Sequence, residues 1–269
     1  MKKSGSHNAG GPLIKTDSEI VLMEKAGRIV ADTLSLLKAY VKPGVKTIEL
    51  DLIAEDFIRS KNAIPAFKGY QRGRLKFPAT LCLSVDDEVV HGIPGDRVLE
   101  EGMILSIDCG CRYEGFFGDS AVTYPVGNVS EEKQLLMKVT EESLMLGVEN
   151  AVAGNKLYDV SKAVQMHVEA NGFSVTRDLV GHGIGKELHE EPPVPNFVPP
   201  LLYRSQYPNV KLEKYMAIAI EPMVQAGTKE TRTLKDGWTV VTRDGKPAAH
   251  FEHTVIIDNN KPLILTLRD

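Results

Sequence analysis

The chain contains one arrangement of helices and strands twice, with the second copy about 110 residues after the first. Residues 19–40 place apolar side chains at steps of three and four, which predicts an amphipathic helix that ends at the turn Pro43-Gly44. Thr47 has the side chain of an N-cap and begins a second predicted helix. Residues 131–152 and the turn Ala153-Gly154 repeat the first helix and its turn, and the apolar positions Val160, Ala163 and Val168 repeat those of the second helix. Such a repeat indicates a fold made of two related halves.

The strands that follow the helices repeat as well. The segment LEEGMILSID, which ends at Asp108, resembles LEKYMAIAIE, which ends at Glu221, and each has a methionine five residues before the acid. A further similarity, between FFGDSAVTY and HFEHTVIID, aligns Asp119 with Glu252. A pseudo-twofold axis would bring acids of one half close to acids of the other. Because helices precede strands in both halves, we expect an α+β fold with a central antiparallel sheet and the helices on one side.

Length and composition fit one large folded unit. The chain has 269 residues, of which 42% are hydrophobic, and this is enough for a substantial core. We expect residues 16–269 to form a single domain with pseudo-symmetric halves at about 16–126 and 127–269. Residues 1–15 contain Gly, Ser and Asn without apolar periodicity, and we expect a disordered leader or an expression scar there.

Charge, cysteine content and hydropathy indicate which partners and which cellular compartment to expect. The formal net charge is -4 and the pI is about 6.0, so no overall field attracts nucleic acid, and no nucleic-acid partner is expected. Three cysteines include a Cys-x-Cys pair with no second pair to complete a zinc knuckle, which indicates reduced thiols. No apolar stretch has the length of a signal peptide or a membrane span, so a cytoplasmic protein without a membrane partner is expected.

The segment VGHGIGKELHEEP, residues 180–192, suggests two kinds of chemistry. Three glycines and a lysine are typical of a phosphate-binding loop, whereas two histidines and a pair of glutamates indicate a metal or proton-transfer site. In a phosphate loop, Ser or Thr follows the lysine and four residues separate the glycines. Here Glu187 follows Lys186 and that gap is absent, which disfavours a nucleotide-binding function.

Four acidic residues fall at strand positions. Asp108 and Asp119 lie eleven residues apart across a glycine-rich turn, and taken alone they are more simply interpreted as solvated turn residues. Glu221 and Glu252, however, each interrupt an apolar strand, where an uncompensated carboxylate is unfavourable. His182 stands between two glycines, which allow the backbone to approach closely. Four carboxylates and one imidazole form an oxygen-rich ligand set that suits two divalent ions.

Several blocks of this sequence resemble the signature of the type I methionine aminopeptidases: VVHGIPG, IDCGCRYEGFFGDSAVT, GHGIGKELHEEP, AIEPM and KDGWTVVTRDGKPAAHFEHT. The blocks occur in the order of that family, and the resemblance extends from about Thr16 to Leu267. It implies the pita-bread fold, whose two pseudo-symmetric halves agree with the internal repeat. It also implies that residues 16–269 are a catalytic metallopeptidase domain.

The resemblance implies a site for two divalent metal ions with five ligands: Asp108, Asp119, His182, Glu221 and Glu252. Asp119 and Glu252 would bridge the ions. Asp108 would bind one ion, and His182 with Glu221 the other. The donor set leaves the metal open between cobalt, manganese, iron and zinc. A hydroxide between the ions would attack the first peptide carbonyl with Glu221 as general base, and a metal-bound α-amine would restrict cleavage to the terminal residue.

The same resemblance implies substrate contacts. His189 would donate a hydrogen bond to the carbonyl as it becomes an oxyanion, and His91 would contact the scissile amide or its neighbour. Trp238, the single tryptophan, would close the pocket for the methionine side chain, with other walls from Tyr70, Phe77, Cys82 and Leu188. Without the resemblance, His91 would be interpreted as a turn residue and Trp238 as a core residue. The other histidines are expected to be structural or on the surface: His7, His167, His250 and His253.

The implied activity is removal of the initiator methionine from nascent polypeptides when the second residue is small. A monomer with transient ribosome association is a further expectation. The chain departs from short family members at two places. Residues 71–77 add basic side chains near the pocket rim, and the connection 192–211 is extended. That connection is too short for the helical insertion of the type II enzymes.

Two alternative functions remain at this stage besides nucleotide binding. A prolidase or aminopeptidase P has the same five ligands but cuts before proline, and it needs a further substrate domain ahead of the first helix, where about 18 residues are present here. A metal-free binding module on the same fold would not need all five ligands, and all five are present. Both alternatives are therefore less favoured than a methionine aminopeptidase.

Overall fold

The computed structural model describes residues 14–268. Residues 1–13 of the predicted leader, and with them His7, lie outside this range. Its last two residues belong to the fold instead: Ile14 forms an antiparallel bridge with Met216, and Lys15 is buried. Within residues 14–268, no helix combines the length and apolar character needed to cross a bilayer.

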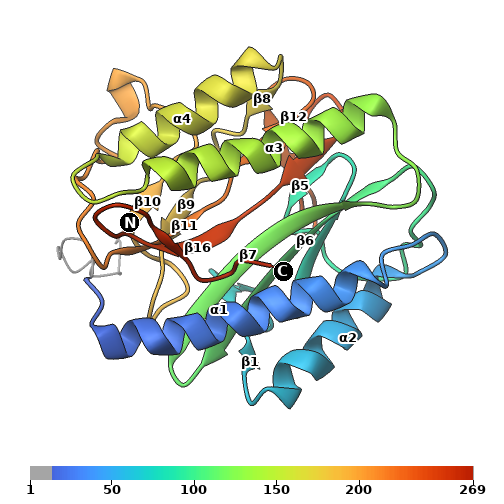
Figure 1. Cartoon of the computed structure of the whole chain (residues 1–269). Helices are drawn as coiled ribbons and strands as arrows, with labels where there is room; N and C mark the ends of the chain where they lie inside the picture. Colours follow the sequence, from blue (N-terminus) through green and yellow to red (C-terminus); the bar gives the residue numbers. More distant parts are fainter. Residues whose placement is uncertain (1–13, 269) are drawn as a thin grey trace.

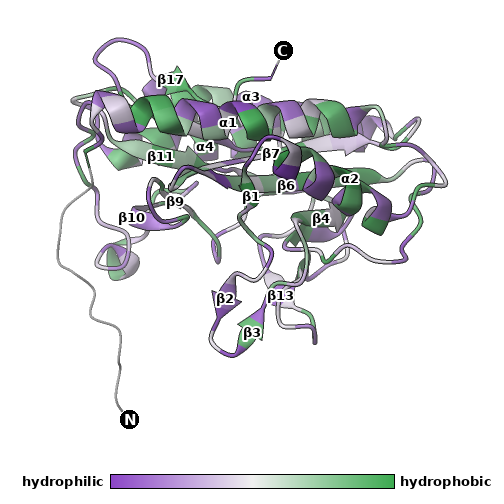
Figure 2. Ribbon diagram, turned by 90° about the horizontal axis from the view of Figure 1, so that it is seen from below, coloured by the Kyte–Doolittle hydropathy of each residue, from purple (hydrophilic) through white to green (hydrophobic). Residues whose placement is uncertain are grey.

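Two pairs of α-helices cover one side of the strands: α1 (Asp17–Lys38), α2 (Thr47–Ser60), α3 (Glu131–Asn150) and α4 (Leu157–Ala170). A short 3-10 helix, η1, follows at Leu201–Tyr203. Figure 1 shows the pair α1–α2 and the pair α3–α4 on opposite halves of the molecule. In Figure 2, α1 and α3 run along one side of the strands, while β2, β3 and β13 project on the other. The helices are therefore on one side of the sheet, as predicted.

The first half contributes seven strands: β1 (Ile64–Pro65), β2 (Gln71–Arg72), β3 (Leu75–Lys76), β4 (Leu81–Val85), β5 (Glu88–Val90), β6 (Ile104–Tyr113) and β7 (Phe116–Pro125). The long hairpin β6–β7 pairs in antiparallel register from Ile104 with Pro125 to Tyr113 with Phe116. Strands β4 and β1 also pair with β6 and are antiparallel to it.

The second half contributes the other strands of the described chain: β8 (Ser174–Val175), β9 (Gly181–Gly183), β10 (Glu190–Val194), β11 (Ala217–Ile220), β12 (Met223–Gln225), β13 (Thr231–Thr233), β14 (Val240–Thr242), β15 (Ala248–His250), β16 (His253–Ile256) and β17 (Leu263–Ile264). Five of them form a sheet in the order β10-β9-β11-β16-β17, with antiparallel neighbours. In Figure 1, β16 runs beside β7, where the two halves meet.

Hydrogen bonds join the halves at this seam. The backbone N–H of Glu252 donates to the carbonyl of Ala121 at 3.0 Å, and the Thr254 hydroxyl donates to the carbonyl of Asp119 at 2.7 Å. The Thr123 hydroxyl donates to the carbonyl of His250 at 2.9 Å. The seam therefore places the strand that carries Asp119 directly beside the segment that carries Glu252.

The internal repeat extends to details of side-chain contact. Buried and exposed positions occur in the same order along residues 51–60 and 161–170. Before the two strands with similar sequences, the N–H of Glu100 donates to the sulfur of Met103 at 3.3 Å, and the N–H of Glu213 donates to that of Met216 at 3.1 Å. The pseudo-twofold relation predicted from the sequence is thus confirmed in the pita-bread arrangement of the elements.

One predicted helix cap is wrong. Helix α2 includes Thr47 as its first residue, and the N-cap is Lys46, whose N–H donates to the Glu49 carboxylate at 2.7 Å. The Thr47 hydroxyl instead donates to the carbonyl of Gly95 at 3.0 Å and accepts from its N–H at 2.9 Å. The hydroxyl of Thr47 fixes the loop at Gly95, and the acid one turn into the helix satisfies the N-terminal donor.

The main core lies between the helices and the sheets. Helix α1 packs on β6 and β7, and α3 packs on β11, β12 and β15. The apolar residues that recur at steps of three and four along α1 are all buried: Ile20, Met23, Ala26, Val30, Leu34 and Leu37. The helices therefore cover one side of the strands, and the hairpin β2–β3 lies on the other (Figure 2).

Candidate active site

Two of the predicted acidic ligands lie in the middle of the β6–β7 hairpin. Asp108 is opposite Ala121, and Asp119 is opposite Gly110. The turn of the hairpin is further along, at Glu114-Gly115, where both residues have positive φ, 45° and 93°. The interpretation of these acids as solvated turn residues is wrong, because Asp119 is 4% exposed and the hairpin extends several residues beyond both acids.

The other predicted ligands come from the second half. Glu221 directly follows β11, and Glu252 lies between β15 and β16. His182 is the central residue of β9 and pairs with Ala219 of β11. Two neighbouring positions without side chains, Gly181 and Gly183, allow this pairing, since a Cβ at either would collide with the backbone of adjacent strands.

The structure brings these five residues together. One ligand atom from each of Asp119, His182 and Glu252 lies within 4.8 Å of the other two. Glu221 approaches the group with its Oε1 atom 3.7 Å from Nε2 of His182. The fifth residue, Asp108, lines the same pocket.

Burial makes this group of acids hard to ionise in the absence of a cation. It raises the pKa of Asp108 to about 7. The pKa values of Asp119, Glu221 and Glu252 are raised well above the usual range, first by burial and then by the charges of neighbouring carboxylates. Burial also lowers the pKa of His182 to about 3, so its imidazole is neutral at pH 7 and available as a ligand.

Unpaired buried oxygens support a cation site. Within the described chain, Asp108 Oδ1, Asp119 Oδ1 and Glu252 Oε1 are buried and have no hydrogen-bond partner. Such atoms are rare in folded proteins unless an ion or water satisfies them. Nδ1 of His182 forms a hydrogen bond with the carbonyl of Gly183 at 2.8 Å, which leaves Nε2 for a metal. These residues therefore fit a divalent metal centre, and a cation would compensate the charges that burial opposes.

The predicted substrate-contacting histidines lie beside this group. His91 follows β5 with a positive φ of 59°, and its Nδ1 is buried without a partner. The rings of His189 and His182 are 4.3 Å apart, centroid to centroid, and Nδ1 of His189 is 3.0 Å from the hydroxyl of Tyr70. Burial lowers the pKa of His189, and it lowers that of His91 to about 4. Both imidazoles are therefore neutral near pH 7.

All the predicted site residues line one pocket: Tyr70, Phe77, Cys82, His91, Asp108, Asp119, His182, Leu188, His189, Glu221, Trp238 and Glu252. Phe77 and Trp238 meet edge to face with their rings 5.3 Å apart. The guanidinium of Arg72 lies 5.0 Å from the centre of the Trp238 ring and donates to the carbonyl of Gly237. One end of the pocket is thus apolar and aromatic, and the other is acidic.

Two residues of this region, Phe67 and His250, are not among the predicted site residues. Phe67 also lines the pocket. His250 is 2% exposed, and its Nε2 is 3.8 Å from Oε2 of Glu221; its position two residues before Glu252 was the available signal. The other two histidines are structural, as expected: His253 is buried against Thr266, and His167 pairs with Glu142.

The strands are antiparallel and related by a pseudo-twofold axis, and one pocket contains buried carboxylates and a histidine. This combination defines the class of metal-dependent peptidases with the pita-bread fold. In agreement with this class, residues 21–259 match Metallopeptidase family M24. The methionine aminopeptidase of Clostridium perfringens is 52% identical over 255 residues, which cover 95% of this chain and 98% of that protein. Methionine aminopeptidase 1 of Bacillus subtilis is 50% identical over 254 residues, or 94% and 98% of the two chains.

Solved structures give the same result. The crystal structure of methionine aminopeptidase from Thermotoga maritima has a TM-score of 0.90 and 42% identity, and covers 96% of this chain and all of that one. The prolidase from Pyrococcus furiosus, with a TM-score of 0.75 and 23% identity, covers 96% of this chain and 66% of that one, and shares the fold alone. The chain therefore belongs to metallopeptidase family M24 and, within it, to the type I methionine aminopeptidases.

Proposed function

We propose that this chain removes the initiator methionine from nascent polypeptides whose second residue is small, in a metal-dependent hydrolysis of the first peptide bond. One observation carries the proposal. A single pocket combines buried acids and His182 at one end with the aromatic walls Phe77 and Trp238 at the other. A peptide whose first side chain enters the apolar end would present its first carbonyl to the acids.

We propose two divalent ions at the acidic end. Asp108, Asp119, His182, Glu221 and Glu252 would hold them. Two observations support this assignment. Asp119, His182 and Glu252 lie close together, and buried oxygens of Asp108, Asp119 and Glu252 have no hydrogen-bond partner. When bound, the ions would supply Lewis acidity, which polarises the scissile carbonyl and makes water nucleophilic at neutral pH. Oxygen-rich ligands with one imidazole suit cobalt, manganese, iron or zinc.

Glu221 is the proposed general base. Its carboxylate is buried, and its two oxygens lie 3.7 Å from Nε2 of His182 and 3.8 Å from Nε2 of His250. A Glu221 oxygen would take the proton from the attacking water.

His189 is the proposed oxyanion donor. Because the imidazole is neutral, one of its nitrogens carries a proton and the other accepts one. A hydrogen bond from the Tyr70 hydroxyl to Nδ1, at 3.0 Å, would hold that proton on Nε2. Nε2–H would then donate to the carbonyl oxygen as negative charge develops there. His91, with its unpaired Nδ1, would contact the scissile amide or its neighbour.

The apolar end suits a methionine side chain. Phe67, Phe77, Cys82, Leu188 and Trp238 all belong to one hydrophobic cluster beside the acids. A thioether is flexible and makes favourable contacts with aromatic rings, which the edge-to-face pair Phe77–Trp238 provides. Arg72 lies over the Trp238 ring, and this position supports a pocket that is closed at its apolar end.

We also propose that residues 16–269 act as one catalytic domain, in agreement with a family match over residues 21–259. Because the substrates are nascent chains, a monomeric enzyme that acts in the cytoplasm, in transient association with ribosomes, fits this function.

A peptide panel tests the proposed function. The metal-loaded protein should release free methionine from Met-Ala-Ser, Met-Gly-Ser and Met-Ser-Ser, and should leave Met-Leu-Ser, Leu-Ala-Ser and Ala-Pro-Ser intact. Efficient release of leucine from Leu-Ala-Ser would contradict the proposed specificity. Cleavage before proline in Ala-Pro-Ser, with none of Met-Ala-Ser, would indicate a prolidase-like activity instead.

A further inference from the structure

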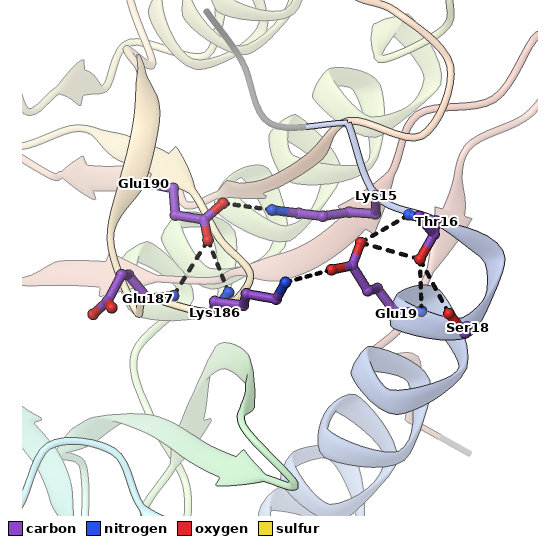
Figure 3. A network of polar contacts seen from close by, with 7 residues as sticks. All are labelled: Lys15, Thr16, Ser18, Glu19, Lys186, Glu187 and Glu190. Carbon is purple, nitrogen blue, oxygen red and sulfur yellow. Dashed lines mark hydrogen bonds and ion pairs between the residues drawn. The ribbon is translucent and has the colours of Figure 1, made fainter. Parts of the chain in front are cut away.

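A buried ion pair joins the start of the described chain to the segment that carries His189. Nζ of Lys15 lies 2.5 Å from Oε2 of Glu190, and both side chains are only 5% exposed. Figure 3 shows Lys15 reaching across from the residues before α1 to Glu190, at the start of β10. The two residues are 175 positions apart in the sequence, so this contact closes a very long loop of chain.

The second oxygen of Glu190 organises the turn before it. Oε1 accepts hydrogen bonds from the backbone N–H groups of Lys186, at 2.8 Å, and Glu187, at 3.2 Å. Residues 186–189 belong to no strand, so no neighbouring strand accepts hydrogen bonds from their backbone N–H groups. The Glu190 carboxylate accepts those of Lys186 and Glu187 instead. The Glu190 side chain therefore holds the backbone from Lys186 to Glu190 in one conformation, and His189 is inside that loop.

The surrounding residues make room for the pair and fix it from both sides. A Cβ at Gly185 would collide with Nζ of Lys15 and with the Glu190 carboxylate, so only glycine at this position leaves space for the contact. The N–H of Lys15 donates to the carbonyl of Tyr215 at 2.9 Å, which anchors the lysine backbone close to β11. Neither Lys15 nor Glu190 lines the pocket of the predicted metal ligands.

A second ion pair in the same network gives a matched comparison. Nζ of Lys186 lies 2.7 Å from Oε1 of Glu19, but the Lys186 side chain is 67% exposed. Figure 3 shows this pair next to the buried one, between the first turn of α1 and the loop before β10. Exposed pairs of this kind contribute little because water screens them, whereas a buried pair fixes both partners.

From these contacts, and on the basis of the proposed function, we infer that Lys15 and Glu190 are positioning residues for His189. The Glu190 carboxylate, held by Lys15, fixes the loop 186–190 so that the His189 imidazole reaches both the Tyr70 hydroxyl and the oxyanion. The pair touches no reacting atom and acts only through the backbone of this loop. Residues at the very start of the fold thus set the geometry of a catalytic contact in its second half.

A double-mutant cycle tests this inference. Glu190→Gln should lower kcat for Met-Ala-Ser by about 10- to 100-fold, the range expected for a misplaced catalytic group, while KM changes less than about threefold. Lys186→Met, the matched control, should stay within about twofold of the unmodified protein. In a His189→Ala background, Glu190→Gln should add less than about a twofold loss, because the group that it positions is already absent. An equal loss in both backgrounds would overturn the inference.

Two further measurements keep the test decisive. If Glu190→Gln does not fold, the uncharged pair Lys15→Met/Glu190→Leu removes both charges together and takes its place in the cycle. Near-normal kcat in that variant would overturn the inference. If the unmodified protein releases no methionine, the proposed function fails, and hydrogen exchange with NMR decides instead: the Glu190 variants should exchange the amides of Lys186 and Glu187 about 10-fold faster and shift the His189 ring signals. Unchanged exchange and ring signals would overturn the positioning role.

Discussion

At the scale of single residues, two neighbouring imidazoles have different surroundings. The rings of His182 and His189 are 4.3 Å apart, and burial lowers the pKa of both. Nδ1 of His182 is bound to the carbonyl of Gly183, and its Nε2 faces Glu221. Nδ1 of His189 is bound to the Tyr70 hydroxyl. The first arrangement is typical of a metal ligand and the second of an oriented hydrogen-bond donor.

These surroundings predict different effects of the same substitution. His182→Ala should weaken metal binding, because it removes one of the proposed ligands. His189→Ala should leave metal binding nearly intact and lower turnover by about 100- to 1000-fold, or roughly 3 to 4 kcal/mol of transition-state stabilisation. Isothermal titration with the metal and steady-state kinetics on Met-Ala-Ser measure the two effects. Equal loss of metal in both variants, or near-normal turnover in His189→Ala, would show that the assigned roles are wrong.

Three of the metal ligands were indicated by the sequence because they break local patterns, and the other site residues were implied by the family resemblance. Glu221 and Glu252 were recognisable as acids in apolar segments, and His182 as a histidine between glycines. Asp108 and Asp119 were not recognisable on their own, since a hairpin turn between two acids has the same sequence signal as a solvated loop. Positions such as Lys15 and Glu190 carry no local signal at all, because their contact depends on how two distant segments fold together.

At the scale of elements, the turn between the helices of each pair occurs twice. Gly44, after α1, has φ of 90°, and Gly154, after α3, has φ of 101°. At neither position would a Cβ meet another atom within 4 Å, so backbone conformation alone opposes a side chain there. The sequence identified both turns, because glycine near the end of an apolar periodic segment is a signal for a helix end.

Replacement of these two glycines by alanine should therefore have equal effects. Gly44→Ala and Gly154→Ala should each lower the free energy of unfolding by about 1–2 kcal/mol, the penalty for an L-residue in a left-handed conformation. Gly95→Ala is the control, because its Cβ would also meet nothing within 4 Å and its φ is not positive. Urea denaturation measures all three. A loss for Gly95→Ala as large as for the other two would contradict the conformational explanation.

The boundaries of elements were less predictable than their existence. The first helix was predicted from residue 19 and begins at Asp17, and Thr47 was predicted as an N-cap and is the first residue of α2. The N-terminal donor of α2 is satisfied by Glu49, while the hydroxyl of Thr47 bonds to Gly95, about 50 residues away in the chain. Apolar periodicity fixes which residues face the core, but long-range hydrogen bonds decide where a helix starts.

At the scale of the whole molecule, the two halves meet at carboxylates that protons or metal ions must neutralise. In the metal-free protein the raised pKa values, about 7 for Asp108, mean that the folded state keeps protons that the unfolded chain loses near pH 4. Stability from these groups is present below about pH 4 and is lost as the pH rises through the folded values. Buried His91 and His182, with pKa values of about 4 and 3, make the folded state more stable as the pH rises. This gain ends at about pH 6.5, where the histidines of the unfolded chain also lose their protons.

Metal binding should therefore stabilise the fold more at high pH than at low pH. Ions compete with protons for the same carboxylates, and an ion that binds only the folded state raises the melting temperature. We expect the difference in Tm between manganese-loaded and metal-free protein to grow from pH 5 to pH 8. Scanning calorimetry at several pH values gives this difference directly. A shift that is the same at pH 5 and pH 8 would mean that the ions do not bind at the buried acids.

The pita-bread fold was predictable at this scale because each half carries the same order of helices, strands and acids, and the comparison of the two copies indicates which strands meet. The arrangement of the pocket rim was not, since the hairpin β2–β3 and Arg72 over Trp238 depend on residues 71–77, which have no counterpart in the other half.

The central claim is that peptide cleavage here depends on divalent ions at the five predicted ligands, and one measurement tests it most directly. Protein stripped of metal, with elemental analysis to verify removal, is assayed on Met-Ala-Ser before and after stepwise addition of manganese. We predict no release of methionine from the stripped protein and a recovery of activity that follows the metal content. Full activity in the stripped protein would contradict the claim.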